Sequence, residues 1–192
     1  AAFNDAVALG VIDEMYGENY GYRSSLNSSM VNHLENKIKF LEKMVSLNNS
    51  DLVIDIGSND ATSLKAYSGN HLKVGIDPTG KKLKKYYRDD ITLICDFFTE
   101  KKFKSSFPSK KAKIITSIAM FYDLESPLDF VSDIEKCLDD DGVWHFEQSY
   151  MPSMLRTNSY DTVCQEHIEF YSLDVVNNLL IKCGLRIIDV QM

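Results

Sequence analysis

The sequence predicts an α/β domain with a mostly parallel central sheet and helices on both of its faces. Short apolar segments alternate with helical patterns along the chain, which is typical of parallel α/β folds. Residues 52–56 are apolar enough to form a strand that is buried on both faces, and Gly57 follows directly. With 192 residues, 44% of them hydrophobic, the chain is long enough for one domain with a substantial core.

The turn after residues 52–56 is the first candidate ligand site. Gly57 allows a sharp backbone turn and a close approach of a ligand to the main chain. Ligands of parallel sheets bind beyond the carboxyl ends of the strands. We therefore expect this strand end to supply four pocket residues, namely Asp55, Gly57, Ser58 and Asn59.

The next strand, expected over 72–77, ends in a second acid. Asp77 lies 20 residues after Gly57 and is followed by Pro78. Doubly wound folds place at this position a carboxylate that binds a ribose diol. We therefore predict that Asp77 and Pro78 belong to the same binding site as the glycine turn.

The glycine turn lacks the features that bind phosphate. It contains a single glycine and the acidic Asp60, and neither G-x-G-x-x-G nor G-x-x-x-x-G-K-[ST] occurs in the chain. A carboxylate near a phosphate would be repulsive. A nucleoside without phosphates fits better, and S-adenosylmethionine is the common one; a turn that binds nothing is the alternative.

The N-terminal residues 1–23 predict a linker followed by a tyrosine-rich loop. Tyr20, Tyr22 and Arg23 lie close together with two glycines, a composition that suits a lid over a ligand. A surface turn with its tyrosines packed on the core is the alternative. The domain itself is expected over 24–192, and its first helix over 27–47 with Asn27 or Ser28 as the cap.

The remaining elements follow from periodicity and from turn residues. After Gly57 we expect a helix over 61–67, the strand over 72–77, a basic helix over 81–87, a strand over 91–95, a polar loop over 104–113, and a strand over 112–118. We then expect a helix from Pro127 with Ser126 as its cap, a strand over 143–147, an irregular stretch over 148–171, a helix that Ser172 caps and Gly184 ends, and a strand over 185–190.

The end of the strand over 91–95 supplies a third polar strand end. Asp96 could accept a hydrogen bond from an adenine amino group, and Phe97 could stack on the base. A polar strand end beside a core phenylalanine is the alternative.

Charge and composition exclude several classes of partner. The net charge of −7 argues against nucleic acid, because phosphate binding needs a basic face. The basic run over 81–88 is interpreted as a solvated helix face. The four cysteines form no C-x-x-C pair, so no metal site is expected. The chain has no 18-residue apolar run and no signal peptide, so we expect a cytoplasmic protein without a membrane partner.

Three stretches carry a resemblance to a known family: residues 20–27, residues 55–60, and Glu166 with His167. In this combination the chain resembles class I S-adenosylmethionine-dependent methyltransferases, which have a Rossmann-like fold. More narrowly, it is similar to sugar C-methyltransferases that act on nucleotide-linked keto-deoxyhexoses. The resemblance covers the chain from about residue 16 onward.

The resemblance implies roles for particular residues. The cofactor site would comprise Asp55, Gly57, Asn59, Asp77, Asp96 and Phe97, with Tyr20, Tyr22 and Arg23 closing over cofactor and substrate. Glu166 and His167 would be the catalytic pair, and Tyr22 is predicted as a third catalytic residue. Those enzymes usually have a tyrosine where this chain has Cys164, so the sugar substrate stays open. They also carry further N- and C-terminal regions, and we expect the last strand of the fold to lie outside this chain.

The chemistry of C-methylation explains why a histidine is needed. A base must remove a proton beside a carbonyl group, and an imidazole with a pKa near 6.5 suits that step. His167 is the predicted base, and Glu166 would orient it or hold a substrate hydroxyl. His145 with Glu147 is a weaker alternative pair. A cofactor-binding domain that is inactive alone, and an O- or N-methyltransferase of a small molecule, are the alternative functions. The oligomeric state stays open.

Overall fold

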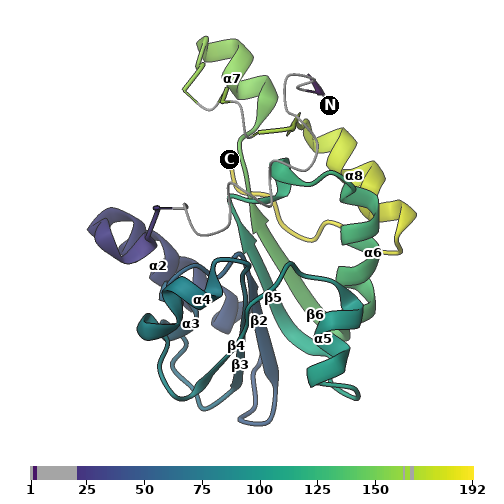
Figure 1. The fold of residues 1–192 in the computed structure, drawn as a ribbon. Coiled ribbons are helices and arrows are strands. Elements are labelled where there is room, and N and C mark those ends of the chain that lie inside the picture. Colours follow the sequence, from purple (N-terminus) through teal and green to yellow (C-terminus); the bar gives the residue numbers. More distant parts are fainter. Residues whose placement is uncertain (1, 4–20, 162, 165–166) are drawn as a thin grey trace.

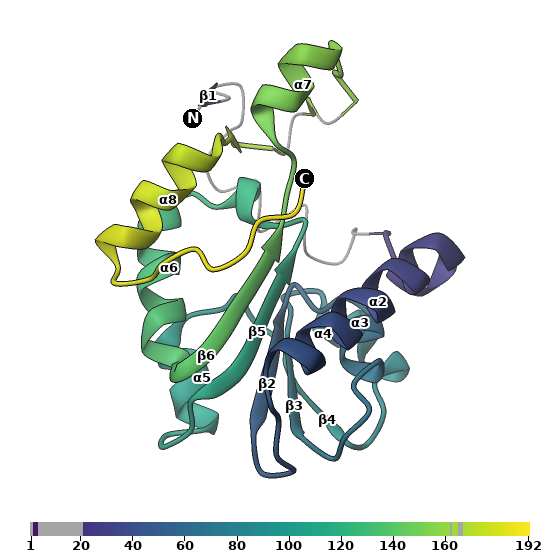
Figure 2. The same ribbon diagram turned by 180° about the vertical axis from the view of Figure 1, so that it is seen from behind.

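The computed structural model describes residues 2–3, 21–161, 163–164 and 167–192. Its centre is a five-stranded sheet in the order β4-β3-β2-β5-β6, in which all neighbouring strands are parallel. Helices cover both faces of this sheet (Figures 1 and 2). The predicted fold class is therefore confirmed.

The strands of the sheet lie close to the predicted positions. They are β2 (Leu52–Ile56), β3 (Leu72–Ile76), β4 (Ile91–Ile94), β5 (Ala112–Ile118) and β6 (Leu138–Glu147). Asp55 lies opposite Gly75 on β3 and Thr116 on β5, so β2 is the central strand. A second, two-stranded sheet pairs β1 (Ala2–Phe3) with β7 (Glu169–Phe170) in antiparallel orientation.

The helices connect these strands. They are η1 (Ser24–Leu26), α2 (Ser28–Met44), α3 (Thr62–Lys65), α4 (Gly80–Leu83), η2 (Lys84–Tyr86), α5 (Glu100–Ser106), η3 (Phe121–Asp123), α6 (Pro127–Cys137), α7 (Met151–Thr157) and α8 (Leu173–Lys182). Asn27 caps α2 as predicted, because its side chain accepts hydrogen bonds from the backbone N–H groups of Ser29 and Met30.

Two hydrophobic clusters hold the layers together. On one face, Ile38 and Leu41 of α2 and Leu64 of α3 pack against Val53 and Ile114 of the sheet. On the other face, helices α5, α6 and α8 pack against β2, β3 and β5. Because β2 is buried on both faces, its continuous apolar run is explained.

Several predicted elements are wrong in detail. The polar loop expected over 104–113 begins later, because α5 extends to Ser106, and Thr99 caps that helix by accepting from the backbone N–H of Lys102. The basic helix over 81–87 is split into α4 and the 3₁₀ helix η2. Neither Ser126 nor Ser172 makes the side-chain cap hydrogen bond expected of it.

The strand expected over 185–190 is also wrong. Gly184 ends α8 with φ +80°, and Leu185 and Ile187 pack on the core while Arg186 and Ile188 are exposed. This alternation produced the prediction. However, none of the described strands pairs with the segment, and a cavity lies between it and β6. In Figure 2 this yellow segment runs from α8 to the C-terminus beside β6.

Candidate functional site

A cavity of about 410 Å³ lies at the carboxyl ends of β2, β3 and β5. We call it the strand-end cavity. Its wall includes the predicted catalytic residue Tyr22 and five of the predicted cofactor residues, namely Gly57, Asn59, Asp77, Pro78 and Phe97. Six predicted residues that come from four separate segments thus share one cavity.

The cavity floor is made of backbone in the left-handed region. Gly57 has φ +69°, Asn59 φ +49° and Ala119 φ +55°. The turn at Gly57 is fixed by a hydrogen bond from its N–H to the carbonyl of Ile76, at 2.9 Å. These turns bend the chain away at the strand ends and leave space beyond the sheet.

Asp77 lies in the wall of this cavity and is only 4% exposed. Its carboxylate accepts hydrogen bonds from the backbone N–H of Asn59 and of Thr79, each at 2.7 Å, and from the Thr79 hydroxyl at 2.5 Å. These bonds fix the orientation of the carboxylate. A carboxylate has about four lone-pair sites, so it can still accept from a hydroxyl of a ligand.

Residues 22–25, which we call the strap, precede α2, and Tyr22 and Ser24 of this segment line the cavity. The side-chain amide of Asn59 donates to the Tyr22 carbonyl at 3.1 Å and accepts from the Ser24 N–H at 3.0 Å. The Arg23 guanidinium stacks on the Tyr86 ring at 4.2 Å and lies 3.5 Å from the Asp60 carboxylate. Tyr22 therefore lines the cavity, whereas the Arg23 side chain contacts Tyr86 and Asp60.

Phe97 and Asp96 lie differently although they are neighbours. Phe97 lines the cavity. The Asp96 carboxylate instead accepts from Lys102 Nζ at 2.5 Å and from the Phe97 N–H at 2.8 Å, and these groups hold the pKa of Asp96 below its usual range. Asp96 lies outside the cavity wall formed by the described residues.

Asp55 and Ser58 also lie outside that wall. The Asp55 carboxylate accepts from the Thr116 hydroxyl at 2.5 Å, and burial raises its pKa to about 7. The Ser58 hydroxyl bonds to the Tyr87 hydroxyl at 2.7 Å. Both side chains are therefore engaged by other residues of the fold and do not face the cavity.

His167 lies next to the segment that follows β5. Its ring packs on the Tyr122 ring with a centroid distance of 4.0 Å, and the neighbouring Ile168 donates its N–H to the Tyr122 carbonyl at 3.0 Å. Tyr122 belongs to η3, which also contains the cavity residue Asp123. Glu166 and Tyr20 fall outside the described residues.

The segment after β5 supplies cavity residues that the sequence reasoning missed. Ala119, Met120, Asp123 and Glu125 all line the strand-end cavity. The only feature of the sequence that could have indicated them is their position, because they follow the carboxyl end of a parallel strand. The two acids make this side of the cavity favourable for a cation.

A second polar cluster lies at the end of β6. His33 Nε2 lies 2.9 Å from both carboxylate oxygens of Glu147, and Lys37 Nζ lies 3.6 Å from one of them. His145 is therefore not the partner of Glu147. Burial lowers the pKa of His145, and its Nε2 is buried without a hydrogen-bond partner among the described residues.

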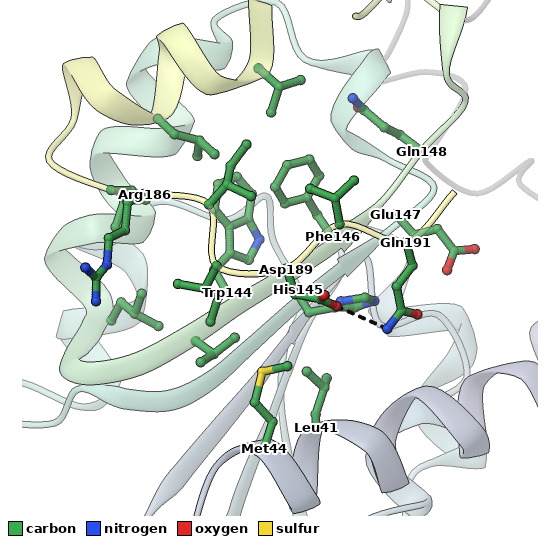
Figure 3. A pocket seen from close by; sticks show the side chains of 18 of the residues that line it. Leu41, Met44, Trp144, His145, Phe146, Glu147, Gln148, Arg186, Asp189 and Gln191 are labelled. Atoms are coloured by element: carbon green, nitrogen blue, oxygen red, sulfur yellow. Dashed lines mark hydrogen bonds between the residues drawn. The ribbon is translucent and has the colours of Figure 1, made fainter. Parts of the chain in front are cut away.

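These side chains border a larger cavity of about 1060 Å³, which we call the groove (Figure 3). It lies between β6 and the C-terminal residues 184–192. Figure 3 shows Trp144 and Phe146 of β6, Met44 and Leu41 of α2, and Asp189 and Gln191 of the C-terminal segment around it. The groove is thus bounded by β6 together with α2 and the C-terminal segment.

Within the described ranges, the side chains form no candidate metal site and no helix suits a membrane span. No group of three or more histidine, cysteine, aspartate or glutamate side chains is arranged to hold a metal ion there. No helix in the described part of the chain is long and apolar enough to cross a membrane.

Sequence comparisons identify relatives of this chain. Residues 30–190 match the family model described as a methyltransferase domain. The chain is 25% identical over 182 residues to the C-methyltransferase NovU of Streptomyces niveus, a match that covers 93% of this chain and 43% of that protein. The chain thus spans less than half the length of this curated relative.

Solved structures share the fold. The cyclopropane synthase MmaA2 from Mycobacterium tuberculosis matches with a TM-score of 0.65 at 14% identity, over 94% of this chain and 76% of that one. The plantazolicin methyltransferase BpumL in complex with SAH matches with a TM-score of 0.60 at 16% identity, over 78% of this chain and 61% of that one. The matched family model, which spans most of the chain, and the shared fold lead to one conclusion: this chain belongs to the methyltransferase domain family, as a class I S-adenosylmethionine-dependent member.

Proposed function

We propose that this chain methylates a carbon atom of a keto sugar or a related small molecule, with a nucleotide-linked sugar as the expected substrate. S-adenosylmethionine would occupy the strand-end cavity, and His167 with Glu166 would handle the proton. The observation that carries the proposal is the packing of the His167 ring on Tyr122, directly beside the cavity-lining segment after β5. The likeness to a C-methyltransferase supports it.

The residues of the strand-end cavity fit the cofactor. Asp77 would bind the ribose hydroxyls, because its carboxylate is already oriented by Asn59 and Thr79. Phe97 and Ile76 offer an apolar surface for the adenine ring. The volume of about 410 Å³ falls within the range of small-molecule sites.

The acids on the opposite side suit the charge of the donor. When bound, the cofactor supplies an electrophilic methyl group on a cationic sulfonium. Asp123 and Glu125 line the cavity where it meets η3 and would favour that cation electrostatically. Neither residue would take part in covalent chemistry.

The acid–base step would be the task of His167. The imidazole would accept the proton from the carbon beside the substrate carbonyl, and the C–H electron pair would form an enolate. That carbon would then bond to the methyl group while the carbon–sulfur bond breaks toward sulfur. Tyr122 would hold the imidazole plane in place through ring packing. Positioned bases typically contribute about 10²–10⁴-fold to the rate.

Calorimetric titration tests the cofactor assignment. Titration with S-adenosylmethionine should give saturable 1:1 binding (about one site per chain), and NAD as the control should give none. If S-adenosylmethionine does not bind, the assignment of the strand-end cavity as the cofactor site is contradicted.

Proton exchange tests the base. A nucleotide-linked keto-deoxyhexose in D₂O should exchange the hydrogen beside its carbonyl in the presence of the protein, as followed by NMR. In the variant His167→Ala, the rate of this exchange should fall by about 10²-fold or more, while cofactor binding should be kept. Exchange at the wild-type rate in that variant would refute the role of His167.

A specific observation favours a second candidate function. The imidazole–carboxylate pair of His33 and Glu147, with distances of 2.9 Å, could accept a proton from a hydroxyl or amine. Such a pair suits an O- or N-methyltransferase, whose substrate needs no acidic C–H bond. Loss of methylation in Glu147→Gln together with normal activity in His167→Ala would favour this alternative.

A further inference from the structure

The strap is held by two neighbouring residues of the glycine turn. Asn59 binds it at both the Tyr22 carbonyl and the Ser24 N–H. Asp60 accepts a hydrogen bond from the Ser25 N–H at 3.1 Å and lies 3.5 Å from Arg23 Nε. Four consecutive strap residues are thus fixed by one turn, although the segments are about 35 residues apart in sequence.

Asp60 is built into its position as a buried anion. Its side chain is 0% exposed. The Thr62 hydroxyl donates to it at 2.5 Å, and Lys65 Nζ donates to its backbone carbonyl at 2.7 Å. Burial acts to raise the pKa of Asp60, but the hydrogen bonds from Ser25 and Thr62 outweigh it and hold that pKa below its usual range. The carboxylate is therefore ionised and faces Arg23.

The same turn reaches the ligand-binding carboxylate. The backbone N–H of Asn59 donates to Asp77 at 2.7 Å, while its side chain holds the strap. The strap residues Tyr22 and Ser24 line the cavity that Asp77 also lines. The strap and the Asp77 carboxylate are thus both held by the Asn59–Asp60 turn.

We propose that Asp60 is a positioning residue that holds the strap over the strand-end cavity and thereby sets the residence time of S-adenosylmethionine. It acts through Arg23 and the Ser25 N–H and does not itself line the cavity in the described part of the chain. This inference rests on the proposed cofactor site. Its two claims, strap closure and ligand residence, can be measured separately.

Limited trypsin digestion measures strap closure. Arg23 is the only lysine or arginine in the first 36 residues, so cleavage of the strap releases one defined N-terminal fragment that mass spectrometry detects. Asp60→Asn and Asp60→Ala should be cut at this bond about 3-fold and about 10-fold faster than the wild type, even without ligand. Asp90→Asn is the control, because Asp90 is also ion-paired but contacts Lys73 and Arg88 instead.

Stopped-flow release of S-adenosylmethionine measures residence. Asp60→Asn and Arg23→Gln should each raise the dissociation rate several-fold, and the double variant should add little, because both remove one contact. The association rate should change by less than about 2-fold. Thermal unfolding verifies that each variant is folded, and Arg23→Gln carries the test if Asp60→Ala does not fold.

The outcomes separate the inference from the function on which it rests. Folded Asp60 variants that are cut at the wild-type rate would refute strap closure. Faster cutting with an unchanged dissociation rate would reduce Asp60 to a structural residue and overturn the proposal. If the wild type does not bind S-adenosylmethionine at all, the proposed function fails and the residence claim fails with it, while digestion of the free protein still decides strap closure.

Discussion

The strand-end cavity and the groove differ in which part of the strands they meet. The strand-end cavity lies beyond the carboxyl ends of three strands, and its walls combine turned backbone, one oriented carboxylate and aromatic rings. The groove is more than twice as large, at about 1060 Å³ against about 410 Å³, but runs along one edge of β6.

This difference is the reason why we propose the smaller cavity, and not the larger one, as the ligand site. Polar groups converge where parallel strands end, because each strand delivers its next residues to the same edge of the sheet. Along a strand edge, by contrast, side chains alternate between the two faces, and the polar cluster around Glu147 gathers only where β6 ends.

The largest expected effect is on stability and comes from Asp55, which lies outside the wall of the strand-end cavity. The pKa of Asp55 is about 7 in the fold against an ordinary value of 3.8, so the native state binds a proton that the unfolded chain releases. The wild type should therefore lose stability as pH rises from about 4 to about 7, by at most about 4 kcal/mol. Asp55→Asn should remove this loss, so its free energy of unfolding relative to the wild type should increase with pH. Urea unfolding at pH 4.5 and pH 8 measures it, and parallel pH profiles of the two proteins would contradict it.

Next in size is the effect of Asp77 on ligand binding. Asp77→Ala should weaken binding of S-adenosylmethionine by about 100-fold, because it removes both the ribose contact and the hydrogen bonds that shape the turn. The matched change in the groove, Asp189→Ala, should leave the affinity unchanged. Calorimetric Kd values for the two variants test the comparison directly, and equal losses would reverse it.

Two glycines with positive φ permit a smaller, paired test. Gly57→Ala and Gly184→Ala should each cost about 1 kcal/mol of stability, because both residues lie in the left-handed region, at φ +69° and φ +80°. An added Cβ meets Met120 no closer than 3.6 Å at Gly57 and nothing within 4 Å at Gly184, so crowding adds little. Only Gly57→Ala should also weaken cofactor binding. Thermal melts and titrations compare them, and weakened binding in both variants would contradict the distinction.

The smallest effect is expected in the groove. Burial lowers the pKa of His145, so the unfolded chain binds a proton more readily, and the wild type should lose stability as pH falls below about 6.5. His145→Phe should remove this dependence and stabilise the protein more at pH 5 than at pH 8, by less than about 1 kcal/mol. Denaturant midpoints at both pH values measure the change, and an equal shift at both would contradict it.

Sequence patterns predicted the parts of the site that depend on local chemistry. Gly57 and Asp77 each follow an apolar strand, Asp77 lies at the distance from Gly57 that is expected of a ribose-binding acid, and Phe97 follows the next strand. Asp123 carried no such pattern, since the segment after β5 has no distinctive composition. Contacts between segments that are distant in sequence could not be predicted either. His33 and Glu147 are 114 residues apart, and no local sequence pattern links them.

The same limit explains the errors in the fold. In residues 185–190 the alternation of apolar and polar residues correctly predicts which side chains pack on the core. A strand also needs a neighbouring strand at hydrogen-bonding distance, and sequence periodicity does not tell whether one is present. Asp55 was predicted for the cavity from its place beside Gly57. The pleat of β2 instead turns its side chain toward Thr116, where its carboxyl is buried.

The single tryptophan of the chain has a practical consequence. Trp144 donates its indole N–H to Ser117 Oγ at 2.9 Å and packs against Phe146 with ring centroids 4.5 Å apart, in the wall of the groove. Intrinsic tryptophan fluorescence is therefore an optical reporter of the region between the two cavities, because the Trp144 ring also lies 6.1 Å from the ring of Phe130, which lines the strand-end cavity. Its emission should follow displacement of the C-terminal segment.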